Sequence, residues 1–126
     1  MIRIMVCAPR PDGEDNHGVA DSLSETGYAV ESFSDGARFL EAAVANPPDL
    51  VVYALRAEID GDLGVLRLLR RAQPGVKLIL LARRPSLETR SAVQPLRPVF
   101  YSMGPPDPAE VIEVVQAALR RRDHPV

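Results

Sequence analysis

The arrangement of apolar segments is the feature that most limits the folds open to this chain of 126 residues. Five short stretches are apolar or β-prone at nearly every position, at residues 2–8, 29–32, 50–55, 76–82 and 99–101. Continuous apolar runs of this length are typical of central parallel strands, because such strands are covered on both faces. The pattern therefore predicts five strands of a buried parallel sheet.

The segments between these stretches carry the start and stop signals of helices. Asp35 and Ser86 are suited to cap helix N-termini, and Gly27 stands where a C-terminal cap belongs. Pro108 is tolerated in the first turn of the last helix, and Pro95 should end a helix that runs from residue 87 to about 94. The predicted core faces are Val19, Ala20 and Leu23, then Phe39, Leu40, Ala43 and Val44, then Leu63, Leu66 and Leu69, and finally Val111, Ile112, Val115, Ala118 and Leu119.

This order, five strands alternating with five helices, decides the expected fold class. Right-handed crossovers between parallel strands place helices on both faces of the sheet. We expect an α/β, flavodoxin-like, doubly wound five-stranded parallel sheet in a single domain. The domain should cover residues 1–121, with residues 122–126 as a C-terminal tail or the start of a linker.

Charge and cysteine content narrow the expected surroundings. The formal net charge is −2, which gives no general attraction to nucleic acid or to a membrane surface. No apolar run reaches the ~18 residues of a membrane span. The single cysteine, Cys7, leaves no internal disulfide to form. We therefore expect a cytoplasmic protein without membrane insertion and without a nucleic-acid partner.

Three segments have the order and spacing of motifs from a known domain family. Residues 27–36 (GYAVESFSDG) look like its second strand and the turn that follows it. Residues 48–55 (PDLVVYAL) look like its third strand, and residues 101–119 (YSMGPPDPAEVIEVVQAAL) look like its fifth strand, Lys-Pro loop and last helix. Together they resemble the receiver domain of bacterial response regulators, the CheY-like family. The likeness covers residues 2–121 and implies the receiver fold and a place in two-component signalling.

The positions that the resemblance assigns to phosphotransfer hold no suitable group. The family's two Mg²⁺-binding acids correspond to Ala8 and Pro9, and its phosphoacceptor aspartate corresponds to Ala54. Its Thr or Ser after the fourth strand corresponds to Ala82, and its phosphate-pairing lysine to Gly104. The chain therefore resembles a degenerate, or pseudo-receiver, domain, for which we expect no catalytic residue, metal or cofactor.

A receiver that lacks this chemistry is expected to act by binding another protein. Our main hypothesis is a phosphorylation-independent protein–protein interaction module in bacterial signalling or regulation. The alternative is a regulatory or dimerisation domain of a longer protein, which would contact its own chain or form a homodimer. The resemblance implies a binding surface on the fourth helix, fifth strand and fifth helix. Its candidate residues are Arg90, Val93, Gln94, Tyr101, Glu110, Glu113 and Val114.

Tyr101 aligns with the aromatic residue whose ring moves inward on activation in this family. It is either an interface residue or a structural tyrosine at a strand end with its hydroxyl in water. Three groups of arginines also stand out. We expect solvated helix ends for them, with an acidic protein partner as the alternative and nucleic acid less favoured because the net charge is negative. The three groups are Arg67, Arg70 and Arg71, then Arg83 and Arg84, and then Arg120, Arg121 and Arg122.

Other residues near the same edge of the sheet suggest alternative chemistries. Six acidic residues follow the first and third strands, and solvated turn and cap positions explain them better than a metal site does. They are Asp12, Glu14, Asp15, Glu58, Asp60 and Asp62. The stretch Asp15-Asn16-His17 invites comparison with cobalamin-binding domains, but Gly18 directly follows the histidine and breaks their spacing. Cys7 lies in a predicted buried strand and is expected to be a core residue rather than a nucleophile.

Overall fold

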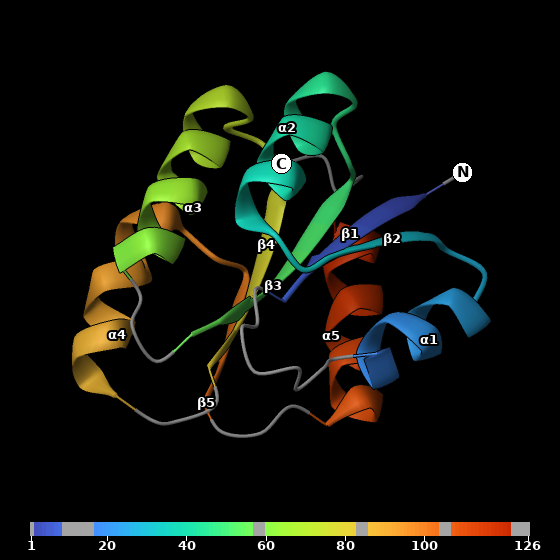
Figure 1. Cartoon of the computed structure of the whole chain (residues 1–126). Coiled ribbons are helices and arrows are strands. Elements are labelled where there is room, and N and C mark those ends of the chain that lie inside the picture. The colour runs from blue at the N-terminus through green and yellow to red at the C-terminus, as the bar shows by residue number, and fades with distance from the viewer. Residues whose placement is uncertain (1, 9–16, 57–59, 83–85, 104–106, 122–126) are drawn as a thin grey trace.

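The computed structural model describes residues 2–8, 17–56, 60–82, 86–103 and 107–121, and confirms the expected α/β fold (Figure 1). Five parallel strands form one sheet in the order β2-β1-β3-β4-β5, which is the flavodoxin-like order. The strands are β1 (Arg3–Cys7), β2 (Ala29–Phe33), β3 (Leu50–Leu55), β4 (Lys77–Ala82) and β5 (Phe100–Met103). The helices are α1 (His17–Glu25), α2 (Gly36–Ala45), α3 (Asp60–Ala72), α4 (Leu87–Val93) and α5 (Pro108–Arg121), with a 3₁₀ turn, η1 (Gln94–Leu96), after α4.

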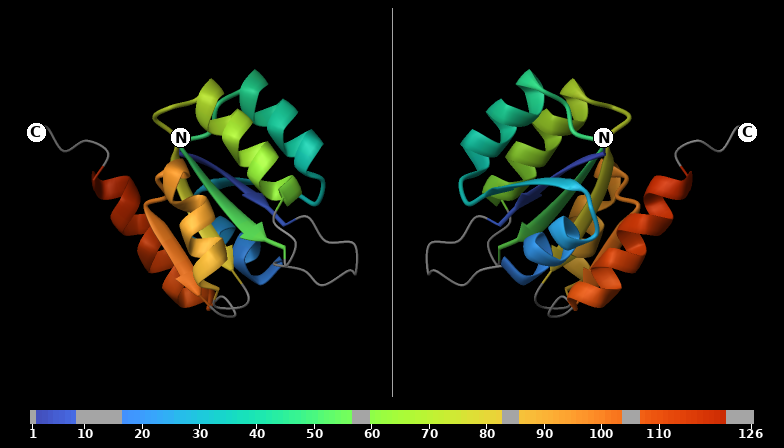
Figure 2. Two further views of the ribbon diagram at one scale, coloured as in Figure 1. Left: turned by 90° about the vertical axis from the view of Figure 1, so that its left-hand side faces the viewer. Right: turned by 90° about the vertical axis from the view of Figure 1, so that its right-hand side faces the viewer.

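The sheet lies between two helical layers (Figures 1 and 2). Helices α2, α3 and α4 cover one face, and helices α1 and α5 cover the other. Alternate residues of each central strand point to opposite faces, so Val51 and Tyr53 enter the first layer while Leu50 and Val52 enter the second. Every residue of β3 is buried, as its continuous apolar run predicts.

The local signals of the sequence position most of the helix ends. The Asp35 carboxylate accepts a hydrogen bond from the backbone N–H of Ala37 at 2.9 Å, and caps α2. The Ser86 hydroxyl accepts one from the N–H of Thr89 at 3.2 Å, and caps α4. Gly27 has a φ of 98°, a left-handed conformation that glycine adopts at little cost after a helix. These capping predictions are confirmed.

One expectation about the helices was wrong. Val44 is 51% exposed, because Phe39 and Ala43 define the buried face of α2 and Val44 lies about 100° round the helix from Ala43.

The fourth helix ends where expected. Helix α4 stops at Val93, and Gln94 caps its C-terminus directly before Pro95. The chain continues as η1, where the missing N–H of Pro95 is not required, and it turns away at Arg97. Within the described residues, no helix is long and apolar enough to cross a membrane.

Candidate functional site

The register of the sheet brings the expected phosphotransfer positions together at its carboxyl edge. Cys7 pairs with Tyr53, so Ala8 and Ala54 follow on neighbouring strands, and Ala82 pairs with Leu55 on the other side of β3. Ala54 is 8% exposed and Ala82 is 4% exposed. Pro9 and Gly104, the other two positions, lie outside the described residues. The edge therefore presents methyl groups, which neither accept a phosphoryl group nor bind a hard cation.

A buried carboxylate lies beside this edge, on the side of α2 and α3. Asp62, in the first turn of α3, has no exposed surface. Its Oδ1 accepts hydrogen bonds from the Tyr53 hydroxyl at 2.9 Å and from Arg56 Nε at 3.1 Å. Its Oδ2 accepts one from the backbone N–H of Arg56 at 2.8 Å. The Arg56 guanidinium also pairs with Oδ1 through Nη2 at 3.1 Å. We call Tyr53, Arg56 and Asp62 the Asp62 network.

The prediction that Asp62 is a solvated turn or cap residue was therefore wrong. The sequence did contain a signal, since a tyrosine in an otherwise aliphatic buried strand needs a partner for its hydroxyl. Gly61 makes room for the network, because a Cβ there would lie 2.9 Å from Arg56 Nη2. Asp60 is exposed as expected, and the other four acidic residues of that set fall outside the described residues.

The network keeps its hydroxyl and the nearby thiol neutral. Burial raises the pKa of the Tyr53 hydroxyl, and the charge of Asp62 raises that pKa further. Burial also raises the pKa of the Cys7 thiol to about 12, with Asp62 and Asp35 adding to the effect. Tyr53 therefore remains a hydrogen-bond donor to Asp62. Cys7, which is 0% exposed, is a core residue as predicted and not a nucleophile.

The described residues form no cluster of three or more His, Cys, Asp or Glu side chains that could hold a metal ion. The comparison with cobalamin-binding domains rests on Asp15, Asn16 and the side chain of His17, which lie outside what the structure describes. Two residues provide the described bonds of Asp62: Tyr53 through its hydroxyl, and Arg56, the cation of the pair, through its guanidinium and its backbone N–H. This part of the edge is thus organised as an internal ion pair.

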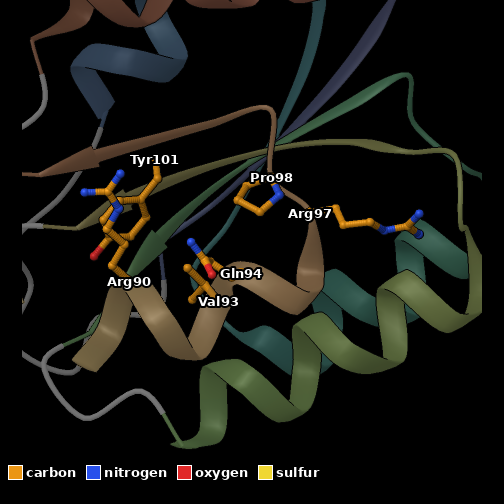
Figure 3. A pocket seen from close by; sticks show the side chains of 6 residues that line it. All are labelled: Arg90, Val93, Gln94, Arg97, Pro98 and Tyr101. Carbon is orange, nitrogen blue, oxygen red and sulfur yellow. The ribbon is translucent and has the colours of Figure 1, made fainter. Parts of the chain in front are cut away.

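The seven candidate partner residues divide into two groups. Arg90, Val93, Gln94 and Tyr101 surround one shallow hollow between α4, η1 and β5 (Figure 3). Val93 is only 1% exposed, so it supports the hollow from the core and offers no free surface. The α5 candidates do not line the hollow. Glu110 and Glu113 are exposed, and Val114 is partly buried against the core between α5 and the sheet.

The hollow has a volume of about 380 Å³, and two of its residues were missed by sequence reasoning. These are Arg97 and Pro98, which precede β5 and are not among the seven candidate partner residues. The Tyr101 hydroxyl oxygen is buried and has no hydrogen-bond partner among the described residues, so the expectation that it lies in water was wrong. Burial raises the pKa of this hydroxyl, and the charge of Arg90 partly opposes the rise.

Arg70 also departs from the expectation of a solvated helix end. Its guanidinium donates to the carbonyl oxygens of Leu96 at 2.9 Å, Pro74 at 3.0 Å and Val76 at 2.7 Å. Arg67 and Arg71 are exposed, as predicted, whereas Arg83, Arg84 and Arg122 lie outside the described residues. One arginine of α3 thus ties this helix to β4 and to η1.

Comparisons with known proteins agree on one family. No protein-family model matches the chain. Transcriptional regulatory protein PrrA of Mycobacterium bovis and of Mycobacterium tuberculosis is 30% identical over 113 residues, which are 86% of this chain and 48% of PrrA. The chain thus spans about half the length of these curated relatives.

Solved structures share the fold over nearly the whole chain. The CheY-like response regulator receiver domain protein of Methanospirillum hungatei superimposes with a TM-score of 0.82 at 22% identity, covering 96% of this chain and 95% of its own. A response regulator receiver domain protein of Clostridium thermocellum gives a TM-score of 0.80 at 17% identity, covering 97% of each chain. Because the fold and the sequence match to PrrA agree, the chain belongs to the CheY-like receiver domains of response regulators.

Proposed function

We propose that this receiver domain works without phosphorylation, as a protein–protein interaction module in bacterial signalling. The observation that carries the proposal is Ala54 at the end of β3, where a methyl group stands in place of a phosphoacceptor. Ala8 and Ala82, which flank it on the neighbouring strands, provide neither a metal ligand nor a hydroxyl. The proposal includes no catalytic activity and no cofactor.

The Asp62 network supports a fold that needs no Mg²⁺. Clustered carboxylates without a metal repel one another, and a bound cation normally relieves that repulsion. Here the buried carboxylate of Asp62 is neutralised by the Arg56 guanidinium of the same chain. The pair needs no added ion, so the domain should hold one state whether or not Mg²⁺ and a phosphoryl donor are present.

The partner surface in this proposal is the face of α4, η1 and β5. Arg90 and Gln94 are exposed there, and Tyr101 lies between them and the sheet (Figure 3). The prolines Pro95 and Pro98 restrict the backbone beside the hollow, which lowers the entropy that is lost when a partner binds. The exposed Glu110 and Glu113 of α5 extend the face beyond the hollow.

A second candidate is a regulatory or dimerisation domain of a longer protein. It is supported by the match to only 48% of the length of PrrA, which leaves room in that relative for a further region. Sedimentation at several concentrations tests this candidate. A concentration-dependent dimer supports it, and a monomer at all concentrations counts against self-association.

Affinity capture from native lysate, followed by mass spectrometry, tests the main proposal. The wild-type domain is run beside a Tyr101→Ala, Arg90→Ala double variant whose folding is confirmed by circular dichroism. Arg38→Ala is the matched control, because Arg38 is 84% exposed on α2 and does not line the hollow. Each capture is repeated with acetyl phosphate and Mg²⁺.

We expect the wild type and Arg38→Ala to capture the same partner protein in equal amounts, and the double variant to lose it. Adding acetyl phosphate and Mg²⁺ should not change the amount captured. Capture that depends on acetyl phosphate would contradict phosphorylation independence. Equal capture by the double variant would place the interface on another face. No capture by any form would favour the second candidate.

A further inference from the structure

Two arginine side chains at the hollow have no partner of their own. Arg90 and Arg97 are both exposed, and neither guanidinium makes a hydrogen bond or ion pair with any residue in the described part of the chain. They lie at opposite ends of the hollow, with Gln94, Val93 and Pro98 between them (Figure 3). None of the six residues that line it is acidic. A chain of net charge −2 thus carries a locally positive groove.

The backbone at Arg97 provides an independent observation. Arg97 has φ 54° and ψ 55°, and it is the one residue other than glycine with a positive φ among those the structure describes. Glycine or asparagine adopts this left-handed conformation more easily than arginine does. The carbonyl oxygens of Leu96 and Arg97 accept hydrogen bonds from Arg70 at 2.9 and 3.4 Å, which hold the turn in place. A residue kept in an unfavourable conformation with a free charged group points to a role outside folding.

The space between the two arginines has an apolar and a polar part. The Tyr101 ring and Pro98 offer apolar surface there, Val93 supports them from the core, and the exposed Gln94 adds a polar side chain. The Tyr101 hydroxyl is a buried donor without a partner among the described residues. We propose that this groove binds an acidic segment of a partner protein, with carboxylates on Arg90 and Arg97 and an apolar side chain between them. The inference rests on the proposed function, because it names the chemistry of the partner at the same surface.

The geometry favours a peptide over a small anion or a nucleic acid. A phosphate or sulfate ion needs donors that converge on one point, whereas the two guanidinium groups lie apart, with Gln94, Val93 and Pro98 between them (Figure 3). Nucleic-acid binding draws on many basic contacts along a phosphate backbone, and only two basic residues line this groove. Guanidinium groups bind carboxylates through short, charge-assisted hydrogen bonds. An acidic peptide with alternating apolar residues can place carboxylates on Arg90 and Arg97 and an apolar side chain against Tyr101 and Pro98.

Fluorescence anisotropy with a synthetic peptide tests the inference. The probe is a fluorescein-labelled peptide of alternating glutamate and leucine, and its control has glutamine in place of every glutamate. The protein is tested as wild type, Arg90→Gln, Arg97→Gly and Arg38→Gln. We expect saturable binding of the glutamate peptide that Arg90→Gln and Arg97→Gly each weaken about tenfold or more, the loss expected for one charge-assisted hydrogen bond. Arg38→Gln should bind like the wild type.

Arg97→Gly separates binding from folding. Glycine relieves the left-handed backbone at this position, so the thermal midpoint should stay the same or rise while the affinity falls. If the thermal midpoint and the peptide affinity both fall, and the affinity returns on cooling, Arg97 has a structural role and the inference is overturned. Equal binding of the glutamine peptide, or no binding of the glutamate peptide, would also overturn it. Tighter, arginine-dependent binding of a labelled oligothymidine would assign the groove to nucleic acid instead.

The failure of this inference can be told apart from the failure of the proposed function. If the peptide does not bind but the lysate partner is still lost from the Tyr101→Ala, Arg90→Ala variant, the interaction module stands and the acidic chemistry is wrong. If capture from lysate requires acetyl phosphate, phosphorylation independence is wrong, whatever the peptide shows.

Discussion

Asp62 shows how a single side chain can anchor the loop end of a strand. Its carboxylate has no contact with solvent, so every bond it makes replaces one that water would otherwise provide. Tyr53 donates to it from within β3, and Arg56 donates from the residue after β3 ends. The network therefore joins the end of β3 to the first turn of α3, beside the positions that carry chemistry in the receiver family.

Removing the Asp62 carboxylate should strongly destabilise the fold. In Asp62→Ala the buried Tyr53 hydroxyl and the partly buried Arg56 amide lose their acceptor, and each lost acceptor costs about 1–3 kcal/mol. The Arg56 guanidinium is 40% exposed and can turn to water, so it adds little to this loss. Asp60→Ala is the control, because Asp60 is exposed in the same helical turn and should cost less than about 1 kcal/mol. Urea unfolding followed by circular dichroism measures both. Similar losses in the two variants would contradict the role of the network.

Cys7 provides a built-in reporter of unfolding. Its thiol is fully buried and its pKa is raised to about 12, first by burial and then by Asp62 and Asp35, so almost no thiolate is available near neutral pH. We expect iodoacetamide at pH 8 to modify the native protein only when the structure opens, and to modify the protein at once in 6–8 M urea. Intact-mass measurement over time follows the reaction. Rapid modification of the native protein would show that β1 is accessible.

The residue-scale features differ in how far the sequence could predict them. The burial of Cys7 follows from its place in a continuous apolar run, because such a run has both faces covered. The burial of Asp62 does not, since a helix-start pattern places an aspartate in the first turn without saying which way it faces. The tertiary pairing with Tyr53, nine residues earlier, decides that direction.

At the scale of elements, one arginine fixes the relation of α3 to the partner face. Arg70 donates to backbone carbonyls of Pro74 and Val76, between α3 and β4, and of Leu96, at the end of η1. Burial lowers its pKa, and the nearby charge of Arg97 lowers it further, although an arginine remains protonated in proteins. The side chain therefore acts as a fixed cation that joins these two segments through their carbonyl groups.

Truncating Arg70 should loosen η1 and the groove beside it. Arg70→Ala leaves the carbonyl oxygens of Leu96 and Val76 without this charged donor, and we expect a loss of about 1.5–3 kcal/mol. Arg71→Ala, at an exposed neighbouring position, should change the stability by less than about 0.5 kcal/mol. Urea unfolding gives both values, and hydrogen exchange at residues 94–97 should rise in Arg70→Ala alone. Unchanged exchange there would show that η1 is held by other contacts.

Element boundaries follow from local chemistry until tertiary contacts intervene. Asp35, Ser86 and Gly27 mark helix ends through their own backbone hydrogen bonds or dihedral angle, so the sequence predicts them. The turn through Pro95 depends on Arg70, which is far away in the sequence and holds the carbonyl of Leu96. A local pattern contains no information on such a contact, and η1 could not be predicted for that reason.

At the scale of the whole molecule, the core and the carboxyl edge overlap only at the strand ends. The core fills the two layers on either side of the sheet, and its residues are almost all apolar. Ala8 and Ala54 lie at strand ends outside both core clusters, whereas Ala82, the last residue of β4, belongs to the first one. Small apolar residues at these positions therefore fit the packing of the neighbouring core. Sequence patterns therefore predict the fold well. They do not predict the groove, because the groove depends on the backbone conformation of Arg97.

Restoring the phosphoacceptor alone should not restore the chemistry. In Ala54→Asp, a carboxylate enters a position that is 8% exposed, with no described metal ligand beside it and Ala82 in place of a hydroxyl. Phosphoryl transfer to an aspartate needs a cation to neutralise the developing charge, and the residue at position 8 cannot bind one. We expect no phosphoryl adduct by intact mass after incubation with acetyl phosphate and Mg²⁺. We also expect a loss of about 1–3 kcal/mol in stability from the desolvated carboxylate.

A receiver domain with its acidic residues intact, run in parallel, shows that the donor is active. A stoichiometric, Mg²⁺-dependent adduct on Ala54→Asp would mean that the edge retains a cation site, and that the loss of phosphorylation rests on residue 54 alone.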